Sequence, residues 1–147
     1  SLGQPEISLA RFENEQRTNL SNNASTPNPP ILPEVYFRPG RAVPTTEGRQ
    51  NRVRVVEWLQ HHPNARVVIV GYTDSRGRRV PNQILGLRRA RAVETFLRSK
   101  GHISRSQIVG VESFGDAKPV CLADTEDCLA RNRRVRIEVL AKPKLSN

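Results

Sequence analysis

The sequence predicts a two-layer α/β domain in which two main helices pack on one side of a mixed sheet. Two segments with helical spacing alternate with short segments rich in β-branched residues, in the order strand, helix, strand, helix, strand, strand. The apolar run Val67–Val70 breaks at Gly71 into a polar loop, and a long helical segment follows it. Because ligands in α/β sheets bind outside the carboxyl ends of strands, this loop is the expected place for a site.

The composition divides the chain into a tether, a domain and a tail. Residues 1–33 contain LSNNASTPNPP, which has too few large apolar groups to fold by itself. Residues 34–142 carry the strand and helix patterns, and residues 143–147 are expected to form a tail. No signal peptide is visible in this stretch of sequence, and there is no run of about 18 apolar residues. Ser1 replaces a starting Met, which indicates a processed or trimmed chain and leaves open a preceding lipid anchor, barrel or transmembrane helix.

The first half of the domain is expected to hold one strand and one helix. The strand lies at about 34–37, within ILPEVYF. Thr45 and Thr46 are N-cap candidates for a helix that runs to about His62, because a hydroxyl there can accept a bond from a free N–H group of the first turn.

The second strand and the second helix surround the polar loop. Residues 66–73 are nearly continuous β-branched residues, as expected for a central strand. A helix is expected at about 82–100, after Pro81, and Gly101 is a suitable C-terminal breaker. This helix therefore begins next to the end of the central strand.

The last part of the chain is expected to add two strands joined by a loop. The strands lie at about 107–113 and 133–140, and a short helical turn is expected around 124–130. Alternation places Arg133 on the same face as Val135 and Ile137. Two interpretations of Arg133 stay open: it is a further anion contact at the site, or it caps the sheet edge and meets solvent.

One arginine of the second helix falls on its apolar face. With about 100° between successive residues, Arg89 lies among Leu85, Val93 and Leu97 rather than with the other arginines. A buried guanidinium keeps its proton and needs an anion, and Asp74 at the end of the preceding strand is the nearest candidate. Either the two residues form a structural salt bridge, or Asp74 takes a ligand cation while Arg89 grips a ligand carboxylate.

The charge is concentrated in the domain. Residues 1–33 hold two basic and three acidic groups, whereas residues 34–147 hold 22 basic and 11 acidic groups, a net charge of +11. Such a domain attracts polyanions such as nucleic acid, anionic lipid or a carboxylate-rich cell wall. No nucleic-acid partner is expected, since the strands lack an aromatic RNA-binding pattern and no basic helix begins with base-reading residues. No GxSxG motif or metal-ligand spacing occurs, so we expect no enzyme, cofactor or metal.

The two cysteines, Cys121 and Cys128, are too far apart for a C-x-x-C pair. We expect them to form a disulfide that closes a short loop, and the alternative is two free thiols in a cytosolic protein. A disulfide is typical of an oxidising compartment such as the periplasm.

Three separated motifs occur in the order GYTDSRG, PNQILGLRRARAV and NRRVRIEV. Together they resemble one family, the OmpA-like domain, a peptidoglycan-binding module of bacterial envelopes, and the resemblance covers roughly residues 33–142. The residues that match the family pattern are Gly71, Thr73, Asp74, Gly77, Asn82, Leu85, Arg89, Ala90, Val93, Asn132, Arg133, Arg134, Val135 and Ile137. The resemblance implies the order βαβαββ, and some members carry a cysteine pair in the same loop.

The resemblance also implies a ligand. In this family the residues at Asp74 and Arg89 bind the free amino and carboxylate groups of a diaminopimelate in the peptidoglycan stem peptide. Thr73 and Asn82 are expected to add neutral hydrogen bonds, and Arg133 a further contact. The departures from the family pattern are Tyr72, Pro81, Gly86 and the basic loop Arg38–Arg41.

The expected function is therefore to anchor an outer-membrane protein, lipoprotein or envelope machine to peptidoglycan in the periplasm of a Gram-negative bacterium. Membrane attachment is expected only through a preceding anchor. The alternatives are a subunit of a secretion or stator complex that serves as a protein-interaction module, with other envelope subunits as partners, and, less favoured, nucleic-acid binding through the basic surface.

Overall fold

The computed structural model describes residues 28–142 of the 147-residue chain. Within it, Ile31–Leu140 form one unit. Most of the expected tether and the whole of the expected tail lie outside the described residues, so this division of the chain stays a prediction. No helix among the described residues is both long and apolar enough to cross a bilayer.

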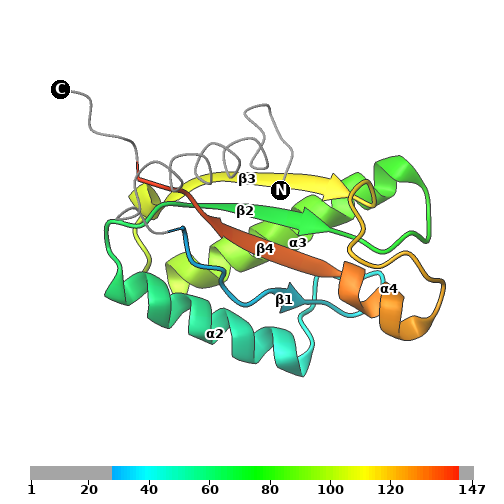
Figure 1. Cartoon of the computed structure of the whole chain (residues 1–147), viewed down its shortest axis with the longest axis horizontal. Coiled ribbons are helices and arrows are strands. Elements are labelled where there is room, and N and C mark those ends of the chain that lie inside the picture. Colours follow the sequence, from blue (N-terminus) through cyan, green and yellow to red (C-terminus); the bar gives the residue numbers. More distant parts are fainter. Residues whose placement is uncertain (1–27, 143–147) are drawn as a thin grey trace. The chain divides into compact units, whose positions relative to one another are not determined.

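The helices and strands follow the predicted order (Figure 1). They are β1 (Val35–Tyr36), α2 (Thr46–His61), β2 (Val67–Tyr72), α3 (Arg79–Ser99), the 3₁₀ turn η1 (Arg105–Gln107), β3 (Ile108–Gly115), α4 (Glu126–Asn132) and β4 (Arg134–Val139). The short helical turn expected before the last strand is α4.

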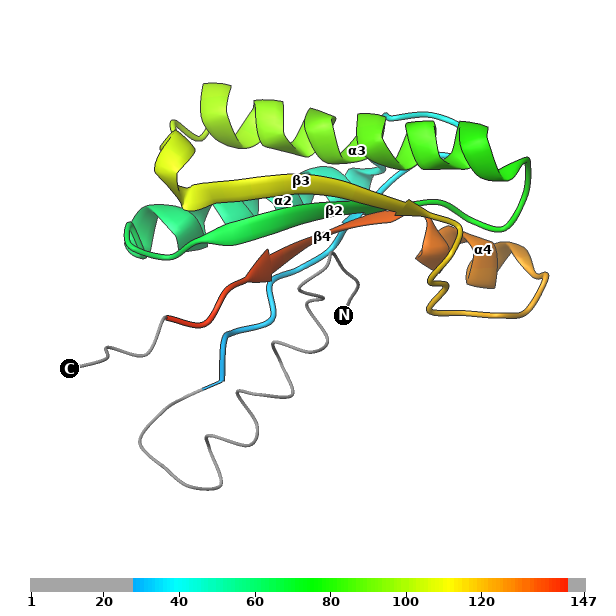
Figure 2. The same cartoon turned by 90° about the horizontal axis from the view of Figure 1, so that it is seen from above.

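The four strands form one mixed sheet in the order β1-β4-β2-β3. Strands β2 and β3 are parallel, and Ile69 is the partner of Val111. Strand β4 is antiparallel to both of its neighbours, with Ile69 opposite Ile137 and Val35 opposite Val135. Helix α3 is the crossover between the two parallel strands and runs along them on one side of the sheet (Figure 2). The predicted mixed sheet is confirmed.

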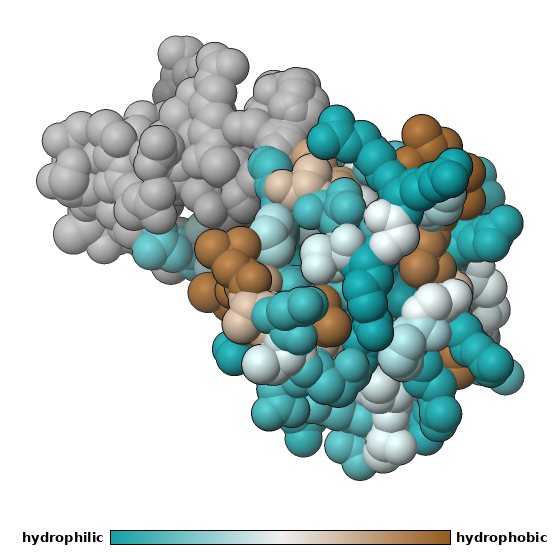
Figure 3. Space-filling view, turned by 90° about the vertical axis from the view of Figure 1, so that its right-hand side faces the viewer, coloured by the Kyte–Doolittle hydropathy of each residue, from teal (hydrophilic) through white to brown (hydrophobic). Residues whose placement is uncertain are grey.

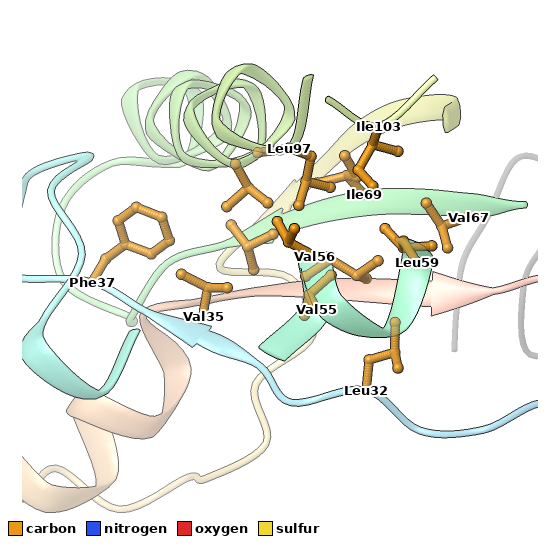
Figure 4. Close-up of a cluster of buried hydrophobic side chains, with 14 residues drawn as sticks. Leu32, Val35, Phe37, Val55, Val56, Leu59, Val67, Ile69, Leu97 and Ile103 are labelled. Atoms are coloured by element: carbon orange, nitrogen blue, oxygen red, sulfur yellow. The ribbon is translucent and has the colours of Figure 1, made fainter. Parts of the chain in front are cut away.

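The core lies between the sheet and the two main helices (Figure 4). Its buried residues are Leu32, Val35, Phe37, Val55, Val56, Leu59, Val67, Ile69, Ala90, Val93, Leu97, Ile103, Val135 and Ile137. Residues of α2 and α3 belong to this single cluster, so both helices cover the same face, as predicted. Each fully buried Val or Leu side chain contributes about 1.5–3 kcal/mol of transfer free energy.

Local chemistry sets where the two helices begin. Thr45 is the N-cap of α2, and its Oγ1 accepts a hydrogen bond of 3.0 Å from the N–H of Gly48. Helix α3 begins at Arg79 rather than at about 82, so Pro81 lies inside its first turn. Proline is tolerated there because first-turn N–H groups have no partner within the helix. As a consequence, Asn82 is the fourth residue of the helix rather than its first.

Two glycines bring α3 unusually close to the sheet. A Cβ atom added at Gly71 of β2 would lie 1.8 Å from the carbonyl oxygen of Gly86 in α3. A Cβ added at Gly86 would lie 2.3 Å from Oγ of Ser113 in β3. The Oγ of Ser113 donates a hydrogen bond of 2.8 Å to the carbonyl of Gln83. These contacts hold the first half of α3 directly against the carboxyl end of β2.

Candidate functional site

Four segments meet at the end of the sheet where β2 stops. They are the loop after β2, the first turns of α3, the loop between β1 and α2, and the junction between α4 and β4; the hydrogen bonds described below connect them. This end lies on the right in Figure 1, beside α4, and Figure 3 shows that its surface is largely hydrophilic with separate small apolar patches.

Asp74 directly follows this strand end and is only 8% exposed. Its Oδ1 accepts a hydrogen bond of 3.0 Å from the backbone N–H of Arg76. Its Oδ2 is shared by two guanidinium groups, with Nη2 of Arg76 at 2.9 Å and Nη1 of Arg133 at 3.0 Å. Burial alone would raise the pKa of Asp74, but the bonds from Arg76 and Arg133 together lower it below the ordinary value of 3.8.

The lowered pKa predicts how Asp74 responds to acid. A carboxyl whose folded-state pKa is depressed stabilises the fold above its unfolded pKa, and this contribution is lost as the pH falls through the folded value. We therefore expect a carbon-detected NMR titration to place the Asp74 midpoint below 3.8. Arg76→Ala should raise the midpoint, because the Arg76 side-chain bond is the largest favourable influence on the charged form. A midpoint at or above 3.8 in the parent would contradict the ion pairs.

Arg89 is fully buried, with 0% exposure, as its position on the apolar face predicted. Its guanidinium donates to three backbone carbonyls: Nε to Arg41 at 2.9 Å, Nη1 to Tyr72 at 3.0 Å and Nη2 to Arg38 at 3.0 Å. None of the ion pairs between described residues joins Arg89 to Asp74, so the structural salt bridge, one of the two interpretations, does not form. The carbonyls of the β1–α2 loop and of the β2 end take its place, because they converge on the guanidinium fork.

Burial lowers the pKa of Arg89 to about 10, while the nearby charge of Asp74 acts in the opposite direction. The positive charge of Arg133 adds a smaller decrease. Arg89 therefore remains a cation at neutral pH, and it is neutralised by carbonyl dipoles and by the field of Asp74 rather than by direct contact with a carboxylate.

Arg133 joins the site from the residue before β4. It is 4% exposed, which shows that the solvent-facing interpretation of this residue is wrong. Its Nε donates to the Phe37 carbonyl at 3.2 Å, Nη1 to Asp74, and Nη2 to Glu126 at 2.7 Å. Arg133 therefore links the loop after β1, the loop after β2 and helix α4.

Thr73 and Asn82 support the loop from its two ends. The Oγ1 of Thr73 donates to the carbonyl of Asp74 at 2.9 Å. The Nδ2 of Asn82 donates to the carbonyl of Arg76 at 2.9 Å and to Oδ2 of Asp116 at 3.3 Å. Gly77 has φ +94° and sits against this Asn82 side chain, so the loop needs glycine there. Thr73 thus lies next to Asp74 and Asn82 binds the loop after β2, and these donors are engaged within the protein.

The sequence analysis missed two participants, Arg76 and Glu126. Arg76 could have been predicted from the sequence. An Asp side chain in a loop commonly accepts a hydrogen bond from the backbone N–H two residues later, and this places Arg76 next to the Asp74 carboxylate. Glu126 could not have been found from spacing, since it reaches Arg133 only after α4 forms. Thr125 caps this helix, and its Oγ1 accepts from the N–H of Cys128 at 3.3 Å.

The disulfide is present, so the alternative of two free thiols is wrong. Cys121 and Cys128 are bonded and close a short loop that ends in the first turn of α4. Asn132 holds the same loop: its Oδ1 accepts from the N–H groups of Val120 and Cys121 at 2.8 and 3.2 Å, and its Nδ2 donates to the Cys121 carbonyl at 2.8 Å. The disulfide and Asn132 together fix α4, and with it Glu126. Among the described residues no three His, Cys, Asp or Glu side chains are grouped to hold a metal ion.

The same elements occur in known proteins. The model of the OmpA family matches residues 36–133, which include both main helices and every site residue named above. The chain belongs to the OmpA family. A curated relative, the peptidoglycan-associated lipoprotein of Buchnera aphidicola, is 37% identical over 100 residues, which are 68% of this chain and 57% of the relative. The chain thus spans little more than half of that relative's length.

Solved structures agree with this OmpA-family assignment. The crystal structure of the peptidoglycan-associated lipoprotein from Burkholderia pseudomallei is 31% identical, has a TM-score of 0.65, and covers 72% of this chain and 88% of its own. The C-terminal domain of MotB from Helicobacter pylori has a TM-score of 0.66 at 18% identity, over 76% of this chain and 86% of its own. The MotB comparison shows the shared OmpA-like fold alone.

Proposed function

We propose that this OmpA-family domain binds peptidoglycan non-covalently and recognises the diaminopimelate of the stem peptide. In this proposal Asp74 takes the ligand ammonium, and Arg89 provides the positive charge that favours the ligand carboxylate. Thr73, Asn82 and Arg133 hold Asp74 in place. The observation that carries the proposal is a nearly buried carboxylate with three arginines around it, at the end of the central strand.

The charges at the site suit a ligand that carries both signs. Asp74 is the acceptor for an ammonium, while Arg89 is a desolvated cation that forms no ion pair with a carboxylate of residues 28–142. A desolvated charge interacts more strongly with an incoming anion than a hydrated one does. In the structure the carbonyls of Arg38 and Arg41 close Arg89 off from solvent, so direct contact with a ligand carboxylate requires the loop 38–41 to move.

We also propose that the domain serves as an envelope anchor in the periplasm, rather than as an enzyme. Relatives named peptidoglycan-associated lipoprotein support this proposal, one of them 37% identical over 100 residues and another, of known structure, 31% identical. The disulfide supports an oxidising compartment. An outer-membrane protein, a lipoprotein or an envelope machine could each contain such a domain.

The proposal predicts selective binding to one type of cell wall. Purified sacculi that contain diaminopimelate should sediment the protein, whereas sacculi with lysine in its place should not, since lysine offers the ammonium but lacks the second carboxylate. The selectivity should persist at about 1 M NaCl, where the Debye length is about 3 Å and general attraction by the basic surface is screened.

Free diaminopimelate-containing tripeptide should compete with the sacculi and release the protein. If the protein sediments equally with both wall types at low salt and with neither at high salt, the attraction is due to net charge alone. That outcome would contradict recognition of diaminopimelate and would make a gel shift with random duplex DNA the next measurement.

A further inference from the structure

The guanidinium groups of Arg76 and Arg133, which both contact Asp74, differ in how easily they can be displaced from the carboxylate. The side chain of Arg133 is 5% exposed and that of Arg76 is 52% exposed, although both contact the same oxygen, Oδ2. Arg133 is held by three partners on three different segments, the Phe37 carbonyl, Asp74 and Glu126. The guanidinium of Arg76 contacts the Asp74 carboxylate from the solvent side.

The main chain of Arg76 stays in place independently of its side chain. Its N–H donates to Oδ1 of Asp74, and its carbonyl accepts from Nδ2 of Asn82 at 2.9 Å. The side chain can therefore swing into solvent without disturbing the loop. The Arg76 side chain is largely exposed, and ion pairs at the surface contribute little to stability, so this movement costs little.

We propose that Arg76 is an internal competitor which occupies the ammonium position on Asp74 until a ligand displaces it. This inference rests on the proposed function, since it takes Asp74 as the receptor for the ligand ammonium. Binding then exchanges one cation for another on Oδ2, and Asp74 keeps the same number of charged partners before and after binding. Arg76 determines affinity and specificity, and it is not a ligand contact in the bound state.

The exchange explains how the site could reject simple cations. A ligand that offers only an ammonium replaces the bond from Arg76 with an equivalent bond and gains almost nothing. A ligand that also brings a carboxylate toward Arg89 gains the second interaction, which Arg76 cannot supply. Specificity for a zwitterion thus follows from the difference between one contact and two, as selection by differential affinity requires.

The experiment is a calorimetric titration of the 147-residue protein with the tripeptide L-Ala-D-Glu-meso-diaminopimelate. Arg76→Ala should bind the tripeptide about twofold to fivefold more tightly than the parent, which is the range that loss of a surface ion pair allows. Arg76→Gln should show the same gain, because it keeps much of the bulk but loses the charge. Arg78→Ala is the matched control: Arg78 is exposed, lies two residues away and is in none of the ion pairs at Asp74.

Arg78→Ala removes one positive charge, as Arg76→Ala does, and so weakens the long-range attraction for the tripeptide, which has a net negative charge, by the same amount. It should therefore bind slightly more weakly than the parent. If the parent binds and Arg76→Ala binds equally well or more weakly, Arg76 is a ligand contact or a bystander and the competitor proposal is wrong, while the proposed function stands. If none of the proteins binds the tripeptide, the proposed function fails, and the competitor proposal fails with it.

Discussion

Asp74→Asn is expected to weaken binding of the diaminopimelate tripeptide by about thirtyfold or more and to abolish co-sedimentation with sacculi. Removal of one partner of a largely desolvated charge pair typically costs about 2–5 kcal/mol, and each 1.4 kcal/mol is about a tenfold change in affinity. Asparagine has the same shape as aspartate but cannot neutralise an ammonium. The effect should be measured by calorimetry and by sedimentation with sacculi.

The fold should survive this substitution. Arg133 keeps its bonds to Glu126 and to the Phe37 carbonyl, so it does not become an unpaired buried cation. We expect a loss of about 1–2 kcal/mol in the free energy of unfolding, comparable to a weakened hydrogen-bond network. Asp127→Asn is the matched control, because Asp127 is exposed in the first turn of α4 and should tolerate the change without loss of binding. A folded Asp74→Asn protein that binds like the parent would refute the site assignment. Arg89 is a poorer probe, since its removal also releases three backbone carbonyls.

Gly71→Ala is expected to destabilise the domain by about 3 kcal/mol or more, which is a large part of the stability of a small domain. The added Cβ would lie 1.8 Å from the carbonyl oxygen and 2.6 Å from the carbonyl carbon of Gly86. Both atoms belong to the backbone of α3, so no side-chain rotation relieves the clash. Helix α3 would have to lift from β2, which disturbs the packing of Ala90, Val93 and Leu97.

Gly110→Ala provides the matched control for this prediction. Gly110 lies in β3, beside β2, and a Cβ there meets nothing within 4 Å. Its substitution should change the urea midpoint little, or raise it slightly, since alanine restricts the unfolded chain more than glycine does. Equal midpoints for the two variants would show that the contact between the glycines does not limit the approach of α3 to the sheet.

The fold could be predicted from the sequence because the spacing of apolar residues shows directly which face of each helix or strand is buried. The β-branched run in β2 and the apolar faces of α2 and α3 predicted the order of the elements and the burial of Arg89, and the OmpA-like resemblance implied the same order with a mixed sheet. The start of α3 was misplaced by three residues, because Pro81 was read as preceding the helix. Proline fits equally well inside a first turn, and the pattern does not distinguish these positions.

The site was harder to predict than the fold, because its bonds run between backbone and side chains. Asp74, Arg89 and Arg133 were all selected, and the structure brings them to one end of the sheet. The partners of Arg89 are carbonyls of Arg38 and Arg41, whose positions depend on the path of a loop rather than on residue type. Because residue type alone does not predict these carbonyl partners, complementary charge suggested a salt bridge between Asp74 and Arg89. In the structure the Asp74 carboxylate is paired with Arg76 and Arg133 instead.

The short strand β1 has a mechanical consequence for the anchoring role proposed above. It is antiparallel to β4: Val35 pairs with Val135, and Ile31 is bridged to Glu138 at the end remote from the site. A ligand held at Asp74 and a force applied through the residues before Ile31 would therefore pull on opposite ends of this strand pair. Such a force acts along the strands, so it loads all the inter-strand hydrogen bonds together in shear. A force perpendicular to the strands would instead break these bonds one after another. The direction in which the chain enters the domain thus suits it to resist tension.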